Sequence, residues 1–299
     1  MYTGPVIDPH HHFWDYASAK HAWIRPADGT AQALGGLAAL RHDFLPDDYV
    51  ARMREHNVIG SVHIEALWDS TDPLGETKWL ETLERPAGVA ARYVAAAPFG
   101  TSLAASVIRE QHKFERVVGL RAILSNHPDA SKSWVSDPNL ADRDAWRQDI
   151  AVLAGLGLHL ELMMYPYQAK PVARLAEDFP NLTIIVNHCG SPIDQDEEGM
   201  ALWRSALAKL ARYENVRLKI SDIAAYVPEW TPDRVTSIIN DCLSAFGTER
   251  CMFGTDYPVV TLQMSLEDVF KTFYQAIVNL NGHEQRAIMH DNAFKIYKF

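Results

Sequence analysis

Two histidines stand two residues apart in a short segment near the start of the chain. His10 and His12 lie within Asp8–Phe13. Residues two apart in a strand point to the same side, so the two imidazoles should project together while His11 points away. Two imidazoles on one rigid strand suit a divalent metal ion, or can act jointly as donors to a substrate oxygen. The alternative is that both are polar strand-end residues that hydrogen-bond to the backbone.

Two later segments end in side chains of the same chemistry. The apolar runs 183–188 and 251–256 end in His188 and Asp256. A single such residue would be unremarkable, but four polar groups at one end of a fold are costly to bury unless they pair, bind metal or react. We therefore expect these two residues to be catalytic, and to form one metal-binding group with the two histidines near the start.

Eight short apolar runs, rich in β-branched or bulky residues, would position these groups. The runs are residues 6–10, 59–65, 92–97, 117–124, 158–164, 183–188, 216–221 and 251–256. Helical patterns lie between and after them, at residues 46–57, 77–83, 102–115, 142–154, 171–179, 199–212, 232–246 and 266–278. This alternation predicts an α/β fold, a distorted (β/α)8 TIM barrel in a single domain over residues 1–299, with its site at the C-terminal strand ends. A doubly wound sheet would normally carry a glycine-rich loop after its first strand, where this chain has histidines.

Two long segments interrupt the repeat, each after a predicted strand. Residues 13–45 contain Trp14 and Trp23, and residues 125–141 contain Trp134. Long loops are usually functional or disordered, and these aromatic side chains favour ordered lids over the site. Trp14 is our candidate for a substrate contact in the first loop.

Further charged and polar candidates lie on the other strands. Glu65 and Glu161 share the alternation of inward-facing positions, where each could ligate the metal, orient a histidine or pair with an arginine. Arg121 could grip an anionic or carbonyl-bearing substrate, or form an ion pair with either glutamate. Lys219 and Ser221 could bind a phosphate, carboxylate or hydroxyl of the substrate.

Together these motifs resemble the amidohydrolase superfamily, which carries His-x-His on strand one, His on strand six and Asp on strand eight. The closer resemblance is to its amidohydrolase-related branch, among sugar-acid lactonases and 2-pyrone-4,6-dicarboxylate lactonase. The segments that carry it are residues 7–14, 43–48, 119–121 and 252–258. The resemblance implies hydrolysis of a sugar-acid or carboxylated lactone in carbohydrate metabolism, with Asp256 as general base.

The resemblance also bears on the cofactor. Dinuclear members use a carboxylated lysine on strand four, where this chain has Arg121, and a further histidine on strand five that has no clear match here. One divalent metal ion is therefore implied, zinc being the best suited, and metal-free catalysis is also compatible. A metal-dependent decarboxylase of the same branch and a hydrolase of amides or other bonds are the alternatives. A non-enzymatic binding module is disfavoured.

Composition restricts the partners. The net charge of −10, with no basic block, argues against nucleic acid and anionic membranes as partners and leaves a small-molecule substrate. No apolar run approaches the roughly 20 residues that span a bilayer. The three cysteines have no short paired spacing, which indicates free thiols. With no signal-peptide pattern, we expect a cytoplasmic protein, and a homo-oligomer is compatible with the sequence.

Overall fold

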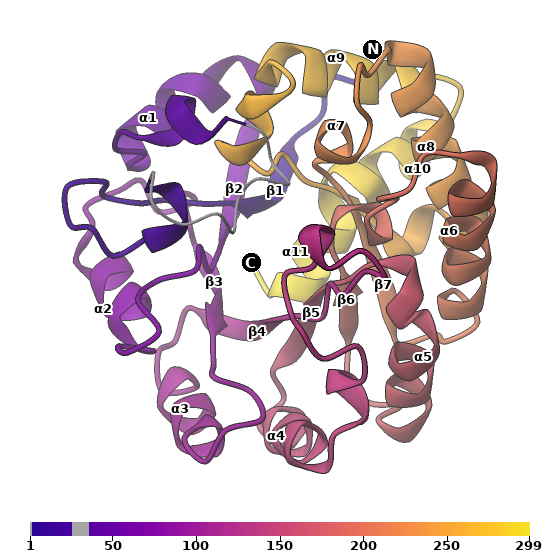
Figure 1. The fold of residues 1–299 in the computed structure, drawn as a ribbon. Helices are drawn as coiled ribbons and strands as arrows, with labels where there is room; N and C mark the ends of the chain where they lie inside the picture. Colours follow the sequence, from indigo (N-terminus) through magenta and orange to yellow (C-terminus); the bar gives the residue numbers. More distant parts are fainter. Residues whose placement is uncertain (1, 26–35) are drawn as a thin grey trace.

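Eight parallel strands form a nearly closed barrel in a computed structural model that describes residues 2–25 and 36–299 (Figure 1). Each strand pairs with the next in sequence order. The strands are β1 (Val6–His11), β2 (Val58–Ile64), β3 (Arg92–Ala96), β4 (Val117–Ile123), β5 (His159–Met163), β6 (Ile184–Val186), β7 (Val216–Ile220) and β8 (Cys251–Phe253). The predicted barrel is therefore confirmed, with each strand within a few residues of its expected bounds.

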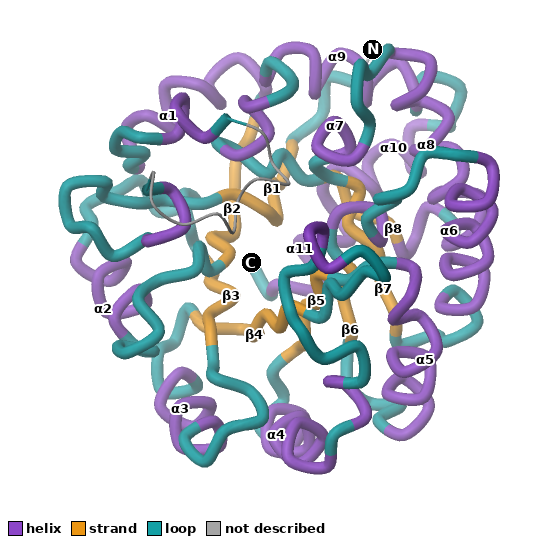
Figure 2. The backbone as a smooth tube through the Cα atoms, viewed as in Figure 1, coloured by secondary structure: helices purple, strands orange, loops and turns teal. Residues whose placement is uncertain are grey.

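Helices surround the strands, as Figure 2 shows. They are α1 (Pro46–Met53), α2 (Gly75–Thr82), α3 (Ala104–Gln111), α4 (Asp144–Gly155), α5 (Ala169–Asp178), α6 (Glu197–Leu210), α7 (Ile223–Tyr226), α8 (Pro232–Phe246), α9 (Leu266–Ala276), α10 (Gly282–Arg286) and α11 (Asn292–Tyr297). The sequence patterns did not predict α7, α10 and α11. Within the described residues, every helix is too short or too polar to cross a bilayer.

The C-terminal helix closes one end of the barrel. In Figure 1, α11 lies near the centre of the ring of strands. Its Ala293 and Tyr297 pack against an apolar cluster on the inner faces of the strands. Arg92, the first residue of β3, donates hydrogen bonds to the carbonyl oxygens of Tyr297 and Lys298. The helix therefore ends against the strand starts, opposite the strand ends that carry the predicted site.

A bulge in β1 changes which of its side chains face inward. Asp8 pairs with Ser61 of β2, and the next regular pair joins His11 to His63. Three steps along β1 thus match two steps along β2. One extra residue in a strand reverses the alternation of all residues that follow it.

This bulge explains how β1 can supply both core and site residues. Ile7 belongs to the inner apolar cluster, and His10 and His12 also face the barrel interior, three and five residues later. His11 points the other way, with its ring 4.4 Å from that of Tyr49 on α1. The predicted orientations of the three histidines are confirmed.

The burial of His11 predicts a specific pH dependence. Burial, followed by the nearby charge of His63, lowers the pKa of His11 well below its usual value. Below pH ~6.5 the unfolded chain binds a proton at this ring and the folded chain does not, so its contribution to stability is complete above that pH and is lost as the pH falls. We expect the unfolding free energy of the wild type to fall more steeply than that of His11→Phe, by up to about 1.4 kcal/mol per pH unit.

Urea denaturation between pH 7 and pH 5 measures the two slopes. His112→Phe is the matched control, because His112 is exposed and its replacement should leave the slope unchanged. Equal slopes for the wild type and His11→Phe would show that His11 takes up its proton without unfolding.

Candidate active site

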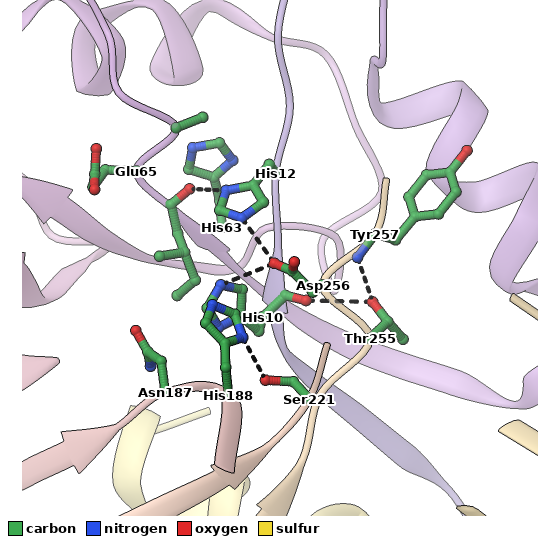
Figure 3. A network of polar contacts seen from close by, with 12 residues as sticks. His10, His12, His63, Glu65, Asn187, His188, Ser221, Thr255, Asp256 and Tyr257 are labelled. Atoms are coloured by element: carbon green, nitrogen blue, oxygen red, sulfur yellow. Dashed lines mark hydrogen bonds and ion pairs between the residues drawn. The ribbon is translucent and has the colours of Figure 1, made fainter. Parts of the chain in front are cut away.

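The four residues singled out in the sequence meet at the C-terminal ends of β1, β6 and β8. Oδ1 of Asp256 lies 3.0 Å from Nε2 of His12 and 3.2 Å from Nε2 of His10 (Figure 3). The rings of His10 and His188 are 4.6 Å apart between centroids. All four side chains are buried. The structure therefore brings the predicted cluster together at one point.

The hydrogen bonds of His12 fix the position of its proton. Nδ1 lies 2.7 Å from the backbone oxygen of Ile64, and a carbonyl oxygen can only accept, so Nδ1 carries the hydrogen. In a neutral ring, Nε2 would then present a lone pair to Asp256. Two lone pairs at that distance repel each other. The contact therefore requires a proton or a metal cation between the two groups.

His10, His188 and Asp256 fit a metal ion. One ligand atom from each lies within 4.8 Å of the others. Among the described residues, Nδ1 of His10 has no hydrogen-bond partner and Nε2 contacts Asp256 without hydrogen-bond geometry, a costly state for a buried imidazole that ligates nothing. Nδ1 of His188 lies 3.0 Å from Oγ of Ser221, which orients the ring (Figure 3). Two imidazoles and a carboxylate are a donor set that suits zinc.

Protonation also favours ligation. Burial lowers the pKa of His188 to about 4, and lowers that of His10 well below its usual value. Both rings are therefore neutral near pH 7, which is the form that binds metal. Burial alone would raise the pKa of Asp256, but the adjacent His188 and His12 bring it below its ordinary value. Its carboxylate is then ionised and able to accept a proton.

Asp8 joins β1 to the segment that carries Asp256. Its carboxylate accepts hydrogen bonds from the backbone nitrogen and the hydroxyl of Thr255, at 2.9 and 2.6 Å, and from the hydroxyl of Tyr49 at 2.9 Å. Burial raises the pKa of Asp8 to about 6. In the sequence, Asp8 stood out only as part of the motif that holds His10 and His12. Its place two residues before His10, on the strand that pairs with the Thr255 segment, was the available signal.

Removing this carboxylate should destabilise the barrel. We expect Asp8→Ala to lower the free energy of unfolding by about 1–3 kcal/mol, because buried donors of Thr255 and Tyr49 lose their acceptor. Urea denaturation at pH 7 measures the change. Glu177→Ala, at an exposed carboxylate on α5, is the control and should shift the curve little. Superimposable curves for Asp8→Ala and the wild type would contradict this role.

Arg121 and Glu65 form a buried pair beside the cluster. Nε of Arg121 lies 2.6 Å from Oε1 of Glu65, and Nη2 lies 2.6 Å from the backbone oxygen of Glu65. Arg121 also lines the pocket, so it is both paired and open to a substrate. Glu65 is not among the metal-binding group. This ion pair with Arg121 is one of the alternatives that we expected for Glu65.

Lys219 and Glu161 lie beneath the cluster. Nζ of Lys219 is 2.6 Å from Oε2 of Glu161 and 2.8 Å from the backbone oxygen of Pro9. Asn187 and Tyr297 donate to the same carboxylate, at 2.7 and 2.6 Å. Neither charged residue lines the pocket. The structure therefore pairs Lys219 with Glu161 beneath the pocket and does not place either residue at the predicted substrate or metal position.

Two other residues that we expected to contact the substrate do not line the pocket. Ser221 bonds to His188 and is not among the residues that line the main pocket. Trp14 is fully buried and donates from Nε1 to the backbone oxygen of His42, so it makes no pocket contact. Its ring packs against that of Trp23, which does line the pocket. Trp14 therefore supports a wall residue and does not itself line the pocket.

A pocket with a volume of about 70 Å³ opens above the cluster. Its floor is polar and consists of His12, Arg121, His188, Asp222 and Asp256. Its walls are apolar or aromatic and consist of Trp23, Ala66, Leu67, Ile123, Trp134, Met163, Tyr165, Ile193, Ala225, Tyr226 and Val259. Both long loops thus contribute a tryptophan, as expected, while residues 26–35 of the first loop lie outside the described residues.

Asp222 is a floor residue that sequence analysis missed. It follows β7 with a left-handed backbone, φ 48°, and its side chain is buried. Burial, followed by the charge of Asp256, raises its pKa well above the usual range. It therefore holds its proton beside an ionised carboxylate. Its position directly after Ser221 was the only signal in the sequence, because alternation does not reach past the end of the strand.

Comparisons with known proteins agree with this geometry. A family model described as amidohydrolase matches residues 7–299. The uncharacterized protein y4mH of Sinorhizobium fredii is 31% identical over 296 residues, which cover 98% of each chain. An L-fucono-1,5-lactonase of Burkholderia multivorans is 25% identical over 306 residues, which cover 97% of this chain and 95% of that protein.

A solved structure has the same architecture. An amidohydrolase of Burkholderia multivorans with bound zinc superposes with a TM-score of 0.82 at 23% identity. The superposition covers 99% of this chain and 100% of that chain. At this level of identity, the likeness shows that the fold is shared along the whole chain.

Proposed function

This chain belongs to the amidohydrolase family whose model matches residues 7–299, and on that premise we propose that it hydrolyses a lactone at the cluster of His10, His12, His188 and Asp256. The observation that carries the proposal is the buried carboxylate of Asp256, which lies in the floor of the pocket and contacts the imidazoles of His10 and His12. An activated water and a polarised ester carbonyl need this combination of groups. The similarity to a protein named L-fucono-1,5-lactonase supports the choice of ester.

In the proposed reaction, Asp256 accepts a proton as water attacks the carbonyl carbon of the ring. The rings of His12 and His188 face the same floor and stabilise the negative charge that develops on the carbonyl oxygen. The bond between the carbonyl carbon and the ring oxygen then breaks. Asp256 returns the proton to the leaving alkoxide, and the product is a hydroxy acid. Arg121, fixed by Glu65, orients the ester.

We further propose that His10, His188 and Asp256 hold one divalent metal ion, with zinc as the best match to this donor set. A bound zinc ion would polarise the carbonyl and lower the pKa of the attacking water. Elemental analysis of the purified protein tests this independently of activity. About one zinc per chain in the wild type, and loss of zinc in His10→Ala, would support the ligand set. Metal-free wild-type protein would leave catalysis to the histidines and Asp256 alone.

Product analysis tests the reaction class. The protein would be incubated with a panel of neutral, hydroxylated and carboxylated lactones, and with hydroxybenzoic acids. Acid release in a pH-stat from at least one lactone, without carbon dioxide, is the expected result. Carbon dioxide release from a hydroxybenzoic acid, with every lactone inert, would replace the proposal with decarboxylation.

A further inference from the structure

The walls and floor of the pocket differ in chemistry. Five charged or imidazole side chains, grouped above as the floor, line the pocket together with eleven apolar or aromatic side chains, grouped above as the walls. The polar atoms of two wall residues are already bonded within the protein: Nε1 of Trp23 donates to the backbone oxygen of Ala66 at 2.7 Å, and the hydroxyl of Tyr165 donates to that of Lys132 at 2.9 Å. These two residues therefore offer apolar ring surface to a substrate.

The walls also lack a positive charge. Arg121 is the one lysine or arginine among the described pocket residues, and its guanidinium is held by Glu65 at 2.6 Å. Residues 26–35, which lie outside the described part of the first loop, contain neither lysine nor arginine in their sequence. A substrate carboxylate in contact with the walls would lose its hydration without gaining a cationic or hydrogen-bonding partner. This loss is unfavourable whatever the charge of the floor.

Apart from Trp134 and Tyr226, the remaining wall residues are aliphatic or contain sulfur. Ile123 and Met163, at the ends of β4 and β5, face the pocket together with Ile193 and Val259. None of these four side chains can form a conventional hydrogen bond with a hydroxyl group on the ring of a substrate. The cavity of about 70 Å³ is several times the roughly 10–15 Å³ needed for one water molecule, and suits a small ring.

From these contacts we propose that the substrate is a small, uncharged lactone whose ring carries apolar substituents in place of carboxylates or several hydroxyls. This inference rests on the proposed lactonase function and narrows its substrate class. The ester group lies on the polar floor, and the remainder of the ring packs against Trp23, Trp134 and the aliphatic wall residues. Sugar-acid and dicarboxylate lactones, the first expectation from the sequence, are then poor substrates.

Three lactones with the same ring size test the proposal. They are δ-hexanolactone, its analogue with the methyl group replaced by a carboxylate, and glucono-δ-lactone. We expect kcat/KM to be highest for the methyl compound, by at least about 100-fold over the carboxylate and about 10-fold over the polyhydroxylated ring. Equal or higher kcat/KM for either polar lactone overturns the inference and leaves the lactonase function standing.

A wall variant tests the physical cause. Met163→Lys places a cation in the apolar wall, and we expect the ratio of kcat/KM for the carboxylate over the methyl lactone to rise by at least about 10-fold. Leu202→Lys on the outer face of α6 adds the same charge at an exposed site and should leave this ratio unchanged. An equal response of the two variants overturns the role of the wall.

A binding assay separates failure of the inference from failure of the function. The δ-lactams that correspond to the methyl and carboxylate lactones resist hydrolysis, and Trp23 and Trp134 report their binding through quenched fluorescence. At least about 10-fold tighter binding of the methyl lactam supports the inference even when no lactone is hydrolysed. Equal binding, preference for the carboxylate, or no binding of either lactam overturns it.

Discussion

Asp256→Asn should lower kcat for lactone hydrolysis by about 10²- to 10⁴-fold, because the amide cannot accept the proton of the attacking water. The replacement keeps the shape of the side chain, so the fold and the neighbouring contact of His12 should persist. Steady-state rates in a pH-stat, with circular dichroism to confirm folding, measure the effect. Weaker substrate binding alone would raise KM instead, so the change must appear in kcat.

The matched control for this variant is Asp233→Asn, at an exposed aspartate in the first turn of α8. It makes the same chemical change far from the floor of the pocket and should leave kcat unchanged. Near-normal kcat for Asp256→Asn would remove Asp256 as the general base. The proton acceptor would then have to be another floor residue.

Lys219→Met should lower the free energy of unfolding by about 3–5 kcal/mol. The lysine is fully buried, and its removal leaves Glu161 charged in the barrel interior without its cation. Asn187 and Tyr297 would still donate to the carboxylate, but neutral donors do not compensate for the missing charge. Chemical denaturation at pH 7 measures the loss.

Two comparisons separate pairing from packing. The double variant Glu161→Gln/Lys219→Met should be destabilised by less than the sum of its single variants, because it leaves no unpaired charge. Lys113→Met breaks an exposed ion pair with Glu110 and should cost less than about 1 kcal/mol. Additive single effects, or a similar small cost at both lysines, would contradict the importance of the buried pair.

Much of the barrel could be predicted because its signal is local. A buried parallel strand is a short apolar run, and all eight runs were visible in the sequence. The site residues His10 and His12 could be paired because two positions on one strand share a face. The register of β1 shifts between Asp8 and His11, and both rings nevertheless contact Asp256 in the barrel interior.

The roles of Lys219 and Glu161 could not be predicted, because they depend on contacts across the barrel. A residue that faces inward can either reach the pocket or pair with another side chain deeper in the barrel. The sequence does not show at which of these two levels an inward-facing residue lies. The hydroxyl of Tyr297 reaches Glu161 from the C-terminal helix, which had no strong periodic pattern. Asp222 was missed for a related reason, because its direction is set by a left-handed backbone after β7.

The most direct measurement is a crystal structure of Asp256→Asn with δ-hexanolactone bound. We predict that the ester lies on the polar floor, with a water molecule roughly 3 Å from both the substituted side chain and the carbonyl carbon. The methyl group should contact the apolar wall. A lactone bound outside the pocket, or one with its carbonyl remote from the substituted side chain and the three histidines, would contradict the account.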